Sequence, residues 1–399
     1  MKIVAERLST QHLAGGGFRT PADAVRWFGA VQAQDFPGAL WAVGMRTVAA
    51  TEASIEQAVS SRAIVRTWPL RGTLHFTAPE DVRWMLAHFA PRTVARAAPR
   101  ASVRESSSSC LNRGAALVIK ALEGGRPLSR PQLYARMERA GIATRANRGV
   151  HILWKCAHDG LICFAGRDGQ QHTMALLDEW LPPAAMLARD EALAALARRY
   201  FTSHGPATLN DFGWWSGLAA ADARSALEMA RNDLESEPMD GAVYWRGMCQ
   251  VPPVLPDAVV ASHALLLPPY DEYTVAYRDR HAVLGPRHAA AARNGIFNPT
   301  IVVKGRVVGT WSAKRVNSRL TVTLTSFAPL RGVSARAVAA EAERYGRFIG
   351  KPVDLQLCGP SGPPCRAGLK ACTTHVCGRV STSRAERNRQ GLRWPGLRV

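Results

Sequence analysis

The sequence predicts a mostly α-helical protein with β-structure, in which three similar units are followed by a β-rich region. Three observations predict this fold. Helical patterns are followed by two short strand patterns in residues 1–100, and the same order returns in 110–185 and 186–255. Strand-length apolar segments then dominate residues 256–355. Hydrophobic residues form 47% of the 399 residues, enough to build several cores.

The first unit begins with helices and ends with a β-hairpin. Thr20 and Pro21 form a helix start signal, with threonine as N-cap and proline in the first turn. Helices are predicted over 2–14 and 21–32, from Pro37, and after Thr51. The segments 63–69 and 72–77 are predicted to form two paired strands. This order is typical of a winged-helix module, a helix-turn-helix fold with a hairpin.

The second and third units repeat this order. The second has predicted helices at 115–123, 130–140 and 148–159 and strands at 161–164 and 171–175, with Ser129 as an N-cap. The third has predicted helices at 190–203, 209–215 and 219–232 and a hairpin over 234–246. The third unit is richer in acidic residues, so a purely structural role for it stays open.

The last region is predicted to be a small antiparallel β-barrel-like domain. Its predicted strands are 264–270, 295–297, 300–303, 306–311 and 320–324, and a helix is predicted at 335–349. Residues 356–399 form a basic tail that we expect to be disordered. The spacing of its cysteines fits no common zinc motif, so we expect no metal there.

Charge points to a nucleic-acid partner. The net charge is +20 and the pI about 10.4, which favours contact with a polyanion. An arginine-rich coding bias is the alternative, but the arginines gather around the helix-turn-helix patterns. We find no apolar run long enough to span a membrane and no apolar signal core at the N-terminus, and therefore expect a cytoplasmic, nucleoid-associated protein.

Basic side chains on the first two units are the candidate DNA contacts. On the first hairpin they could meet phosphates or probe a groove, although solvated edge charges are equally compatible with the pattern. The candidates are Arg66, Arg71, His75, Arg130, Arg145, Arg148 and Lys155. The sequence holds no phosphate-binding loop, dinucleotide fingerprint, serine nucleophile elbow or zinc-protease motif.

The segment Gln32-Ala33-Gln34-Asp35 is the candidate catalytic site. It places two amides and a carboxylate beside an apolar run. In a helix, residues two apart diverge by about 200°, so we expect a helix end or a loop here. The simpler interpretation is that the glutamines bond to backbone groups and that Asp35 caps the helix from Pro37.

These residues resemble the AlkZ-like DNA glycosylases, tandem winged-helix proteins related to YcaQ. The resemblance covers residues 1–355 and omits the tail. Its motifs are QAQDFPGALW at 32–41, RTWPLRGTLHF at 66–76, LPPYDEY at 267–273 with YRDR at 277–280, and NGIF at 294–297 running into GRVVGTW at 305–311.

The resemblance implies a monofunctional glycosylase of base excision repair that hydrolyses the N-glycosidic bond of alkylated purines. It implies double-stranded DNA carrying such lesions as the partner, no cofactor, and we expect a monomer. The AlkZ branch has Gln-x-Gln where the YcaQ branch has Gln-x-Asp, so Gln32 and Gln34 take the catalytic positions. N7-alkylguanine is the expected lesion type, with bulky adducts and interstrand crosslinks left open.

Two neutral amides suit this reaction. A purine alkylated at N7 or N3 is already cationic and leaves without a general acid, so the enzyme has to position water beside a cationic sugar. We expect Gln34 to position the water, Gln32 to assist it, and Asp35 to be subsidiary, as a general base or only a cap. The alternative function is a non-catalytic winged-helix transcriptional regulator; a structural nucleoid protein is a third.

Overall fold

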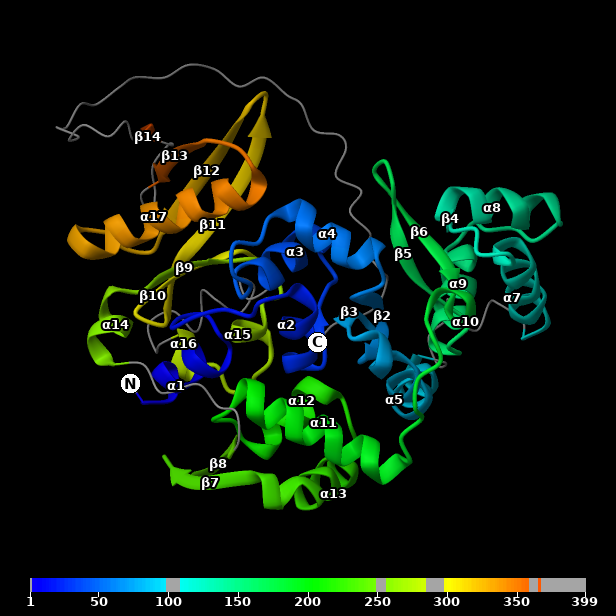
Figure 1. The fold of residues 1–399 in the computed structure, drawn as a ribbon, viewed down its shortest axis with the longest axis horizontal. Helices are drawn as coiled ribbons and strands as arrows, with labels where there is room; N and C mark the ends of the chain where they lie inside the picture. Colours follow the sequence, from blue (N-terminus) through cyan, green and yellow to red (C-terminus); the bar gives the residue numbers. More distant parts are fainter. Residues whose placement is uncertain (1, 98–107, 249–255, 285–297, 359–364, 367–399) are drawn as a thin grey trace. The chain divides into compact units, whose positions relative to one another are not determined.

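A computed structural model describes residues 2–97, 108–248, 256–284, 298–358 and 365–366. These residues form a mixed α/β fold with more helix than strand (Figure 1). Their strands make two six-stranded sheets and one two-stranded sheet. Most strand pairs are antiparallel, as the sequence predicted.

The first unit packs its helices around a hairpin. The elements are α1 (Lys2–Thr10), α2 (Pro21–Phe28), β1 (Val31–Gln32), α3 (Phe36–Gly44), α4 (Glu52–Ser60), β2 (Val65–Leu70), β3 (Thr73–Thr77), η1 (Pro79–Asp81) and α5 (Val82–Ala97). Arg71 and Gly72 join β2 to β3 with φ of 55° and 72°, the left-handed pair that a tight hairpin turn needs. The predicted N-cap Thr20 accepts a backbone N–H, and so does Thr51, which caps the helix predicted to follow it.

Two expected helix ends in this unit are wrong. The helix predicted over 21–32 ends at Phe28, because Gly29 adopts φ of 73° and closes it as a C-cap. Residues 31–32 then form the edge strand β1 and pair with β3. The helix predicted over 2–14 likewise ends at Thr10.

The second unit continues the same sheet. Its elements are α7 (Ser108–Leu122), β4 (Leu128–Ser129), α8 (Arg130–Arg139), α9 (Arg148–His158), β5 (Ile162–Asp168), β6 (Gln171–Leu176) and α10 (Leu177–Trp180). Ser129 starts α8 with a capping box, since its N–H donates to the Gln132 side chain at 2.7 Å. Arg66 of β2 pairs with Phe164 of β5, so the two hairpins share one sheet of order β1-β3-β2-β5-β6-β4.

The third unit is helical with its own hairpin. It contains α11 (Arg189–His204), α12 (Leu209–Ser216), α13 (Ala220–Ala230), η2 (Arg231–Asp233), β7 (Leu234–Met239) and β8 (Ala242–Gly247). Thr208 is the N-cap of α12, and its side chain accepts from Asp211 N–H. Trp215 is fully buried and packs with Tyr200 and Phe212 in a core that this unit shares with α5.

The last region is an open mixed sheet under one long helix. Its elements are α14 (Asp257–Ser262), β9 (Ala264–Leu267), α15 (Glu272–Val275), α16 (His281–Leu284), β10 (Thr300–Val303), β11 (Arg306–Val316), β12 (Arg319–Ser326), α17 (Gly332–Ile349), β13 (Val353–Cys358) and β14 (Cys365–Arg366). The helix α17 packs on the sheet (Figure 1).

The expected barrel and its purely antiparallel pairing are corrected here. Within the described residues the strand order is β14-β13-β12-β11-β10-β9, with β9 and β14 at open edges, so the sheet does not close. The crossover through α17 makes β13 parallel to β12. The sheet therefore runs through Cys358 and includes residues 365–366, past the expected start of the tail at 356. The predicted strand 295–297 and residues 367–399 lie outside the described residues.

Separate sequence motifs meet in one core between the first unit and this sheet. Trp41 Nε1 donates to Leu266 O at 2.7 Å, and Trp311 Nε1 donates to Leu267 O at 2.8 Å. Tyr273 Oη donates to Gly305 O at 2.8 Å. Gln32 also pairs with His75, so parts of the four motifs behind the family resemblance are neighbours in space.

Candidate active site

Gln32 and Gln34 lie where an edge strand leaves the first sheet. Gln32 of β1 pairs with His75 of β3, and Ala33 N–H donates to Leu74 O at 2.7 Å, one residue beyond the strand. Gln32 ends a strand, and Gln34 and Asp35 lie in the short loop that follows it, so of the two expected alternatives the structure has the loop and not the helix end. Backbone pairing holds the segment in register with the hairpin.

Gln32 is held at its main chain and at its side chain. Its N–H donates to Glu272 Oε1 at 2.7 Å, and its Oε1 lies 3.4 Å from Arg71 Nη2. A guanidinium only donates, so the amide oxygen is the atom that faces Arg71. The side chain is 8% exposed, and its oxygen keeps a second lone pair that could accept from water.

Gln34 and Asp35 are half-buried and each accepts a backbone N–H. Gln34 Oε1 accepts from Leu74 N at 3.2 Å. Asp35 is the N-cap of α3, and its Oδ2 accepts from Gly38 N at 2.9 Å. A Cβ on Gly38 would lie 2.6 Å from Asp35 Oδ2 and 3.0 Å from Pro269, so glycine is required at this close approach. The expected capping role of Asp35 is confirmed.

Glu272 is hydrogen-bonded to the main chain of Gln32. In the sequence it stands in the motif LPPYDEY, and in the structure its side chain is buried, with three N–H groups pointing at it. Besides Gln32 N, Trp215 Nε1 donates to Oε2 at 3.0 Å, and His204 Nε2 lies 3.3 Å from Oε2. Burial acts to raise the pKa of Glu272, but the hydrogen bonds from His204 and Gln32 and the charge of Arg71 outweigh it and lower the pKa. We therefore treat Glu272 as ionised.

Arg71 and His75 face this site from the hairpin and not the solvent. Arg71 Nη1 donates to Trp215 O, and its Nη2 lies 3.4 Å from His75 Nε2. Burial and the Arg71 charge lower the pKa of His75 to about 3, so its imidazole is neutral. Nδ1 lies 2.9 Å from Thr73 O and carries the proton, leaving Nε2 to accept from Arg71.

Arg66 also holds the main chain of the site, at Ala33. It is 2% exposed, and its Nε and Nη2 donate to Ala33 O at 3.0 and 2.9 Å. Burial lowers its pKa to about 9, although the charge of Asp35 opposes that shift. The expected phosphate contacts of Arg66, Arg71 and His75 are revised accordingly, because these side chains are turned inward onto the Gln32–Asp35 segment.

The other candidate DNA contacts lie on the second unit. Arg145 is exposed before α9, and within the described residues Arg145 and Arg148 make no side-chain hydrogen bond or ion pair. Arg130 is half-buried, and its guanidinium lies 5.9 Å from the Tyr134 ring. Lys155 Nζ pairs with Asp159 at 2.6 Å on α9. None of these four shares a contact with Gln32 or Gln34.

One basic surface was missed by the sequence reasoning. The β11–β12 ribbon projects from its sheet (Figure 1). Residues 312–319 at its end are all exposed. Lys314 lies there beside Arg315 and Arg319, which pair with Glu52 and Asp354, and Val316 is 42% exposed at the tip. The basic residues on both sides of Asn317 in the sequence are the signal that could have revealed it.

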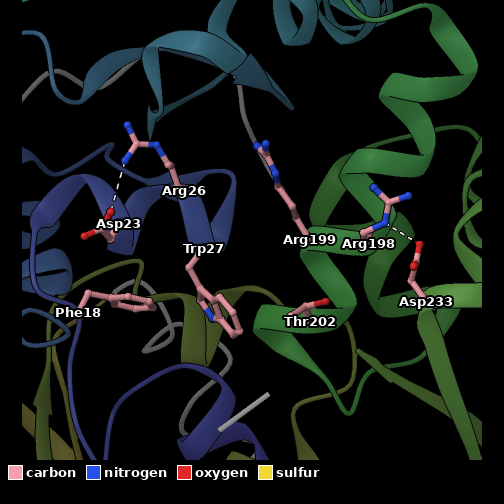
Figure 2. Close-up of a pocket in the computed structure, with 8 residues that line it drawn as sticks. All are labelled: Phe18, Asp23, Arg26, Trp27, Arg198, Arg199, Thr202 and Asp233. Atoms are coloured by element: carbon pink, nitrogen blue, oxygen red, sulfur yellow. Dashed lines mark hydrogen bonds and ion pairs between the residues drawn. The ribbon is translucent and has the colours of Figure 1, made fainter. Parts of the chain in front are cut away.

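A surface cavity of about 420 Å³ lies elsewhere, between α2 and α11 (Figure 2). Trp27 and Arg199 are among its lining residues, and Gln32 and Gln34 are not. Its arginines are already matched by carboxylates: Arg26 with Asp23 and Glu80, Arg198 with Asp233, and Arg199 with Asp81. We therefore do not place the catalytic site there.

The described part of the chain offers neither a cluster of metal ligands nor a membrane-spanning helix. In that part of the chain no three His, Cys, Asp or Glu side chains gather as metal ligands would. None of its helices has the length and apolar character needed to cross a bilayer.

Comparison with known proteins identifies the class and then the family. A family model described as "DNA glycosylase AlkZ-like" matches residues 25–348. The chain is a DNA glycosylase. It belongs to the AlkZ-like family, which confirms the resemblance drawn from the four motifs.

A named protein and a solved structure, both from Streptomyces sahachiroi, are similar to this chain. A protein named "Interstrand DNA cross-link repair glycosylase" from Streptomyces sahachiroi is 26% identical over 369 residues, covering 88% of this chain and 96% of that protein. The solved structure of Streptomyces sahachiroi DNA glycosylase AlkZ has a TM-score of 0.69 at 24% identity, covering 89% of this chain and 98% of that one. The second comparison shows a shared fold.

Proposed function

We propose that this DNA glycosylase hydrolyses the N-glycosidic bond of alkylated purines in base excision repair, with Gln32 and Gln34 as its catalytic residues. One observation carries the proposal. Both amides sit at the same strand end, and both amide oxygens are anchored by protein donors, Arg71 and Leu74 N–H. An amide held in this way is preorganised, since each oxygen retains a lone pair for a water proton.

Two oriented amides are enough for this reaction. Alkylation at N7 or N3 gives the purine a positive charge, so its bond to the sugar breaks without protonation by the enzyme. Gln34 Oε1 orients the attacking water, and Gln32 Oε1 assists it and faces the cationic sugar with a partial negative charge. Because unmodified bases are poor leaving groups, two amides would leave them intact. Asp35 acts as a helix cap and is subsidiary in the reaction.

We further propose that the three helix–hairpin units are winged-helix modules, with boundaries at 1–100, 110–185 and 186–255. Two modules share a sheet through β2 and β5, which supports a rigid arrangement of their hairpins. Arg130, Arg145, Arg148 and Lys155 on the second module contact the DNA backbone, together with the exposed β11–β12 tip. Arg66, Arg71 and His75 support the catalytic segment instead.

The proposal also covers which lesions the protein accepts. The relative from Streptomyces sahachiroi is named for interstrand crosslink repair, and we propose that this chain accepts N7-alkylguanine both as a monoadduct and within a crosslink. Gln32 lies on β1, the edge strand of its sheet, and a site at a sheet edge suits a lesion with an attached bulky group.

The test uses duplexes that each carry one defined lesion: N7-methylguanine, a bulky N7 adduct or an N7–N7 crosslink. The full chain is incubated with each duplex, and abasic sites are measured by alkaline cleavage. Release from any alkylated duplex and none from undamaged DNA supports the proposal. Absence of release, with tight binding to one undamaged sequence, would support a transcriptional regulator instead.

A further inference from the structure

We infer that Glu272 is a positioning residue of the glycosylase reaction: it fixes the main chain of Gln32 and balances the charge of Arg71 beside it. The inference rests on the proposed function of Gln32 and adds a residue that acts through it. Glu272 follows Gln32 by 240 residues in the chain, and its carboxylate is bonded to the main chain of Gln32.

The geometry gives Glu272 a direct hold on Gln32. Its Oε1 accepts the Gln32 N–H at 2.7 Å, the distance of a strong charge-assisted hydrogen bond. Oε2 is fixed in turn by Trp215 at 3.0 Å and by His204 at 3.3 Å. A carboxylate gripped at both oxygens is rigid, so it sets the position of the Gln32 main chain.

The neighbouring carboxylate shows what an ordinary structural role looks like here. Asp271 is equally buried, and it forms a bidentate ion pair with Arg46, at 2.8 Å to each oxygen. Glu272 is bonded to no guanidinium or ammonium group among the described residues, and burial lowers the pKa of His204, which stays neutral. Burying a carboxylate without a directly bonded cation costs stability. One of the three hydrogen-bond donors to Glu272 is the main-chain N–H of Gln32, in the catalytic segment.

Charge explains why a carboxylate is needed. Arg71 orients the Gln32 amide, but its positive charge would repel both the cationic purine and the cationic sugar that forms as the bond breaks. The opposite charge of Glu272 acts on the same guanidinium. Glu272 thus allows Arg71 to hold Gln32 without raising the barrier to a positively charged transition state.

The test compares Glu272→Gln with Asp271→Asn, an adjacent carboxylate of equal burial, in the full chain. Single-turnover release of 7-methylguanine is measured at saturating protein and divided by the folded fraction from thermal unfolding, and Kd for the same duplex is measured by anisotropy. We expect Glu272→Gln to lose about 100-fold in rate per folded molecule, with Kd within about 3-fold. Asp271→Asn should keep the wild-type rate per folded molecule.

Glu272→Asp provides a second variant that keeps the charge but retracts the oxygen from Gln32 N–H. We expect it to lose about 10-fold in rate, less than Glu272→Gln. The inference is overturned if the Glu272 variants lose only folded protein, as Asp271→Asn does, or if Kd alone changes. Failure of the wild-type chain to release any base would instead overturn the proposed function.

Discussion

The side-chain oxygen of Gln34 accepts the main-chain N–H of Leu74 at 3.2 Å, in the position next to the last backbone pair between the edge strand and the hairpin. The amide of Gln34 therefore continues the pairing after β1 ends. Gln32, one residue before that last pair, is held by Arg71 of the same hairpin. Both candidate catalytic amides are oriented by β2–β3 and its turn.

Replacing Gln34 by alanine should reduce catalysis without unfolding the protein. We expect a loss of about 100-fold or more in the single-turnover rate, because one preorganised polar group is removed from the reacting centre. The free energy of unfolding should fall by only about 1 kcal/mol, the contribution of one hydrogen bond. Gln57→Ala, at an exposed position of α4, is the matched control and should change neither quantity.

Two substitutions separate a capping role of Asp35 from a role as general base. Asparagine caps helices as well as aspartate does but cannot act as a general base. Asp35→Asn should therefore leave the free energy of unfolding unchanged and keep the single-turnover rate within about 3-fold of wild type. Asp35→Ala should lose about 1 kcal/mol of stability with its cap. Urea unfolding and single-turnover assays check both. A large rate loss in stable Asp35→Asn would make this carboxylate a participant in the reaction.

Buried His75 should make stability depend on pH. Its native pKa of about 3 is far below the ordinary histidine value of 6.5, so the unfolded chain binds more protons in the interval between them. The contribution of His75 is therefore complete above pH 6.5 and is lost as pH falls toward 3. At pH 5 the loss is about 2 kcal/mol.

The check is urea unfolding of wild type and His75→Gln at pH 7 and pH 5. The variant should lose less stability between these two pH values than wild type, by about the same 2 kcal/mol. Comparing two proteins cancels the effect of other buried groups, such as Glu341, whose pKa burial raises to about 7. Equal losses in the two proteins would show that His75 is accessible to protons in the folded state.

Arg145 and Arg148 should act on binding alone. If each neutralises one phosphate, the double alanine variant should lower the slope of log K against log salt concentration by about 2. The single-turnover rate at saturating protein should stay within about 2-fold of wild type. Arg198→Ala is the control, since Arg198 is already paired with Asp233. An unchanged slope in the double variant would remove these residues from the DNA surface.

Local signals in the sequence were enough for most of the fold. The caps at Thr20, Thr51, Ser129 and Thr208 depend on groups within three residues, so the helix starts follow from short motifs. Pairings made at long range did not follow from such motifs. β1 needs a partner more than forty residues away, and β13 reaches its parallel partner only after α17.

The same distinction holds for the site. Gln32, Gln34 and Asp35 stand together in the sequence and could be proposed from it. Glu272 could not be connected to Gln32, because no local pattern reveals a contact across 240 residues. The inward direction of Arg66 was also missed, since a strand arginine has the same sequence pattern on either face of a sheet.

The most direct test of the account uses a duplex with one N7–N7 guanine crosslink, treated with the wild-type chain and with the Gln32→Ala, Gln34→Ala double variant. Denaturing gels measure strand separation, and alkaline cleavage measures abasic sites. The account predicts that wild type separates the strands and leaves abasic sites, while the folded double variant binds the same duplex and releases neither strand. Equal release by the double variant, or none by wild type, would contradict it.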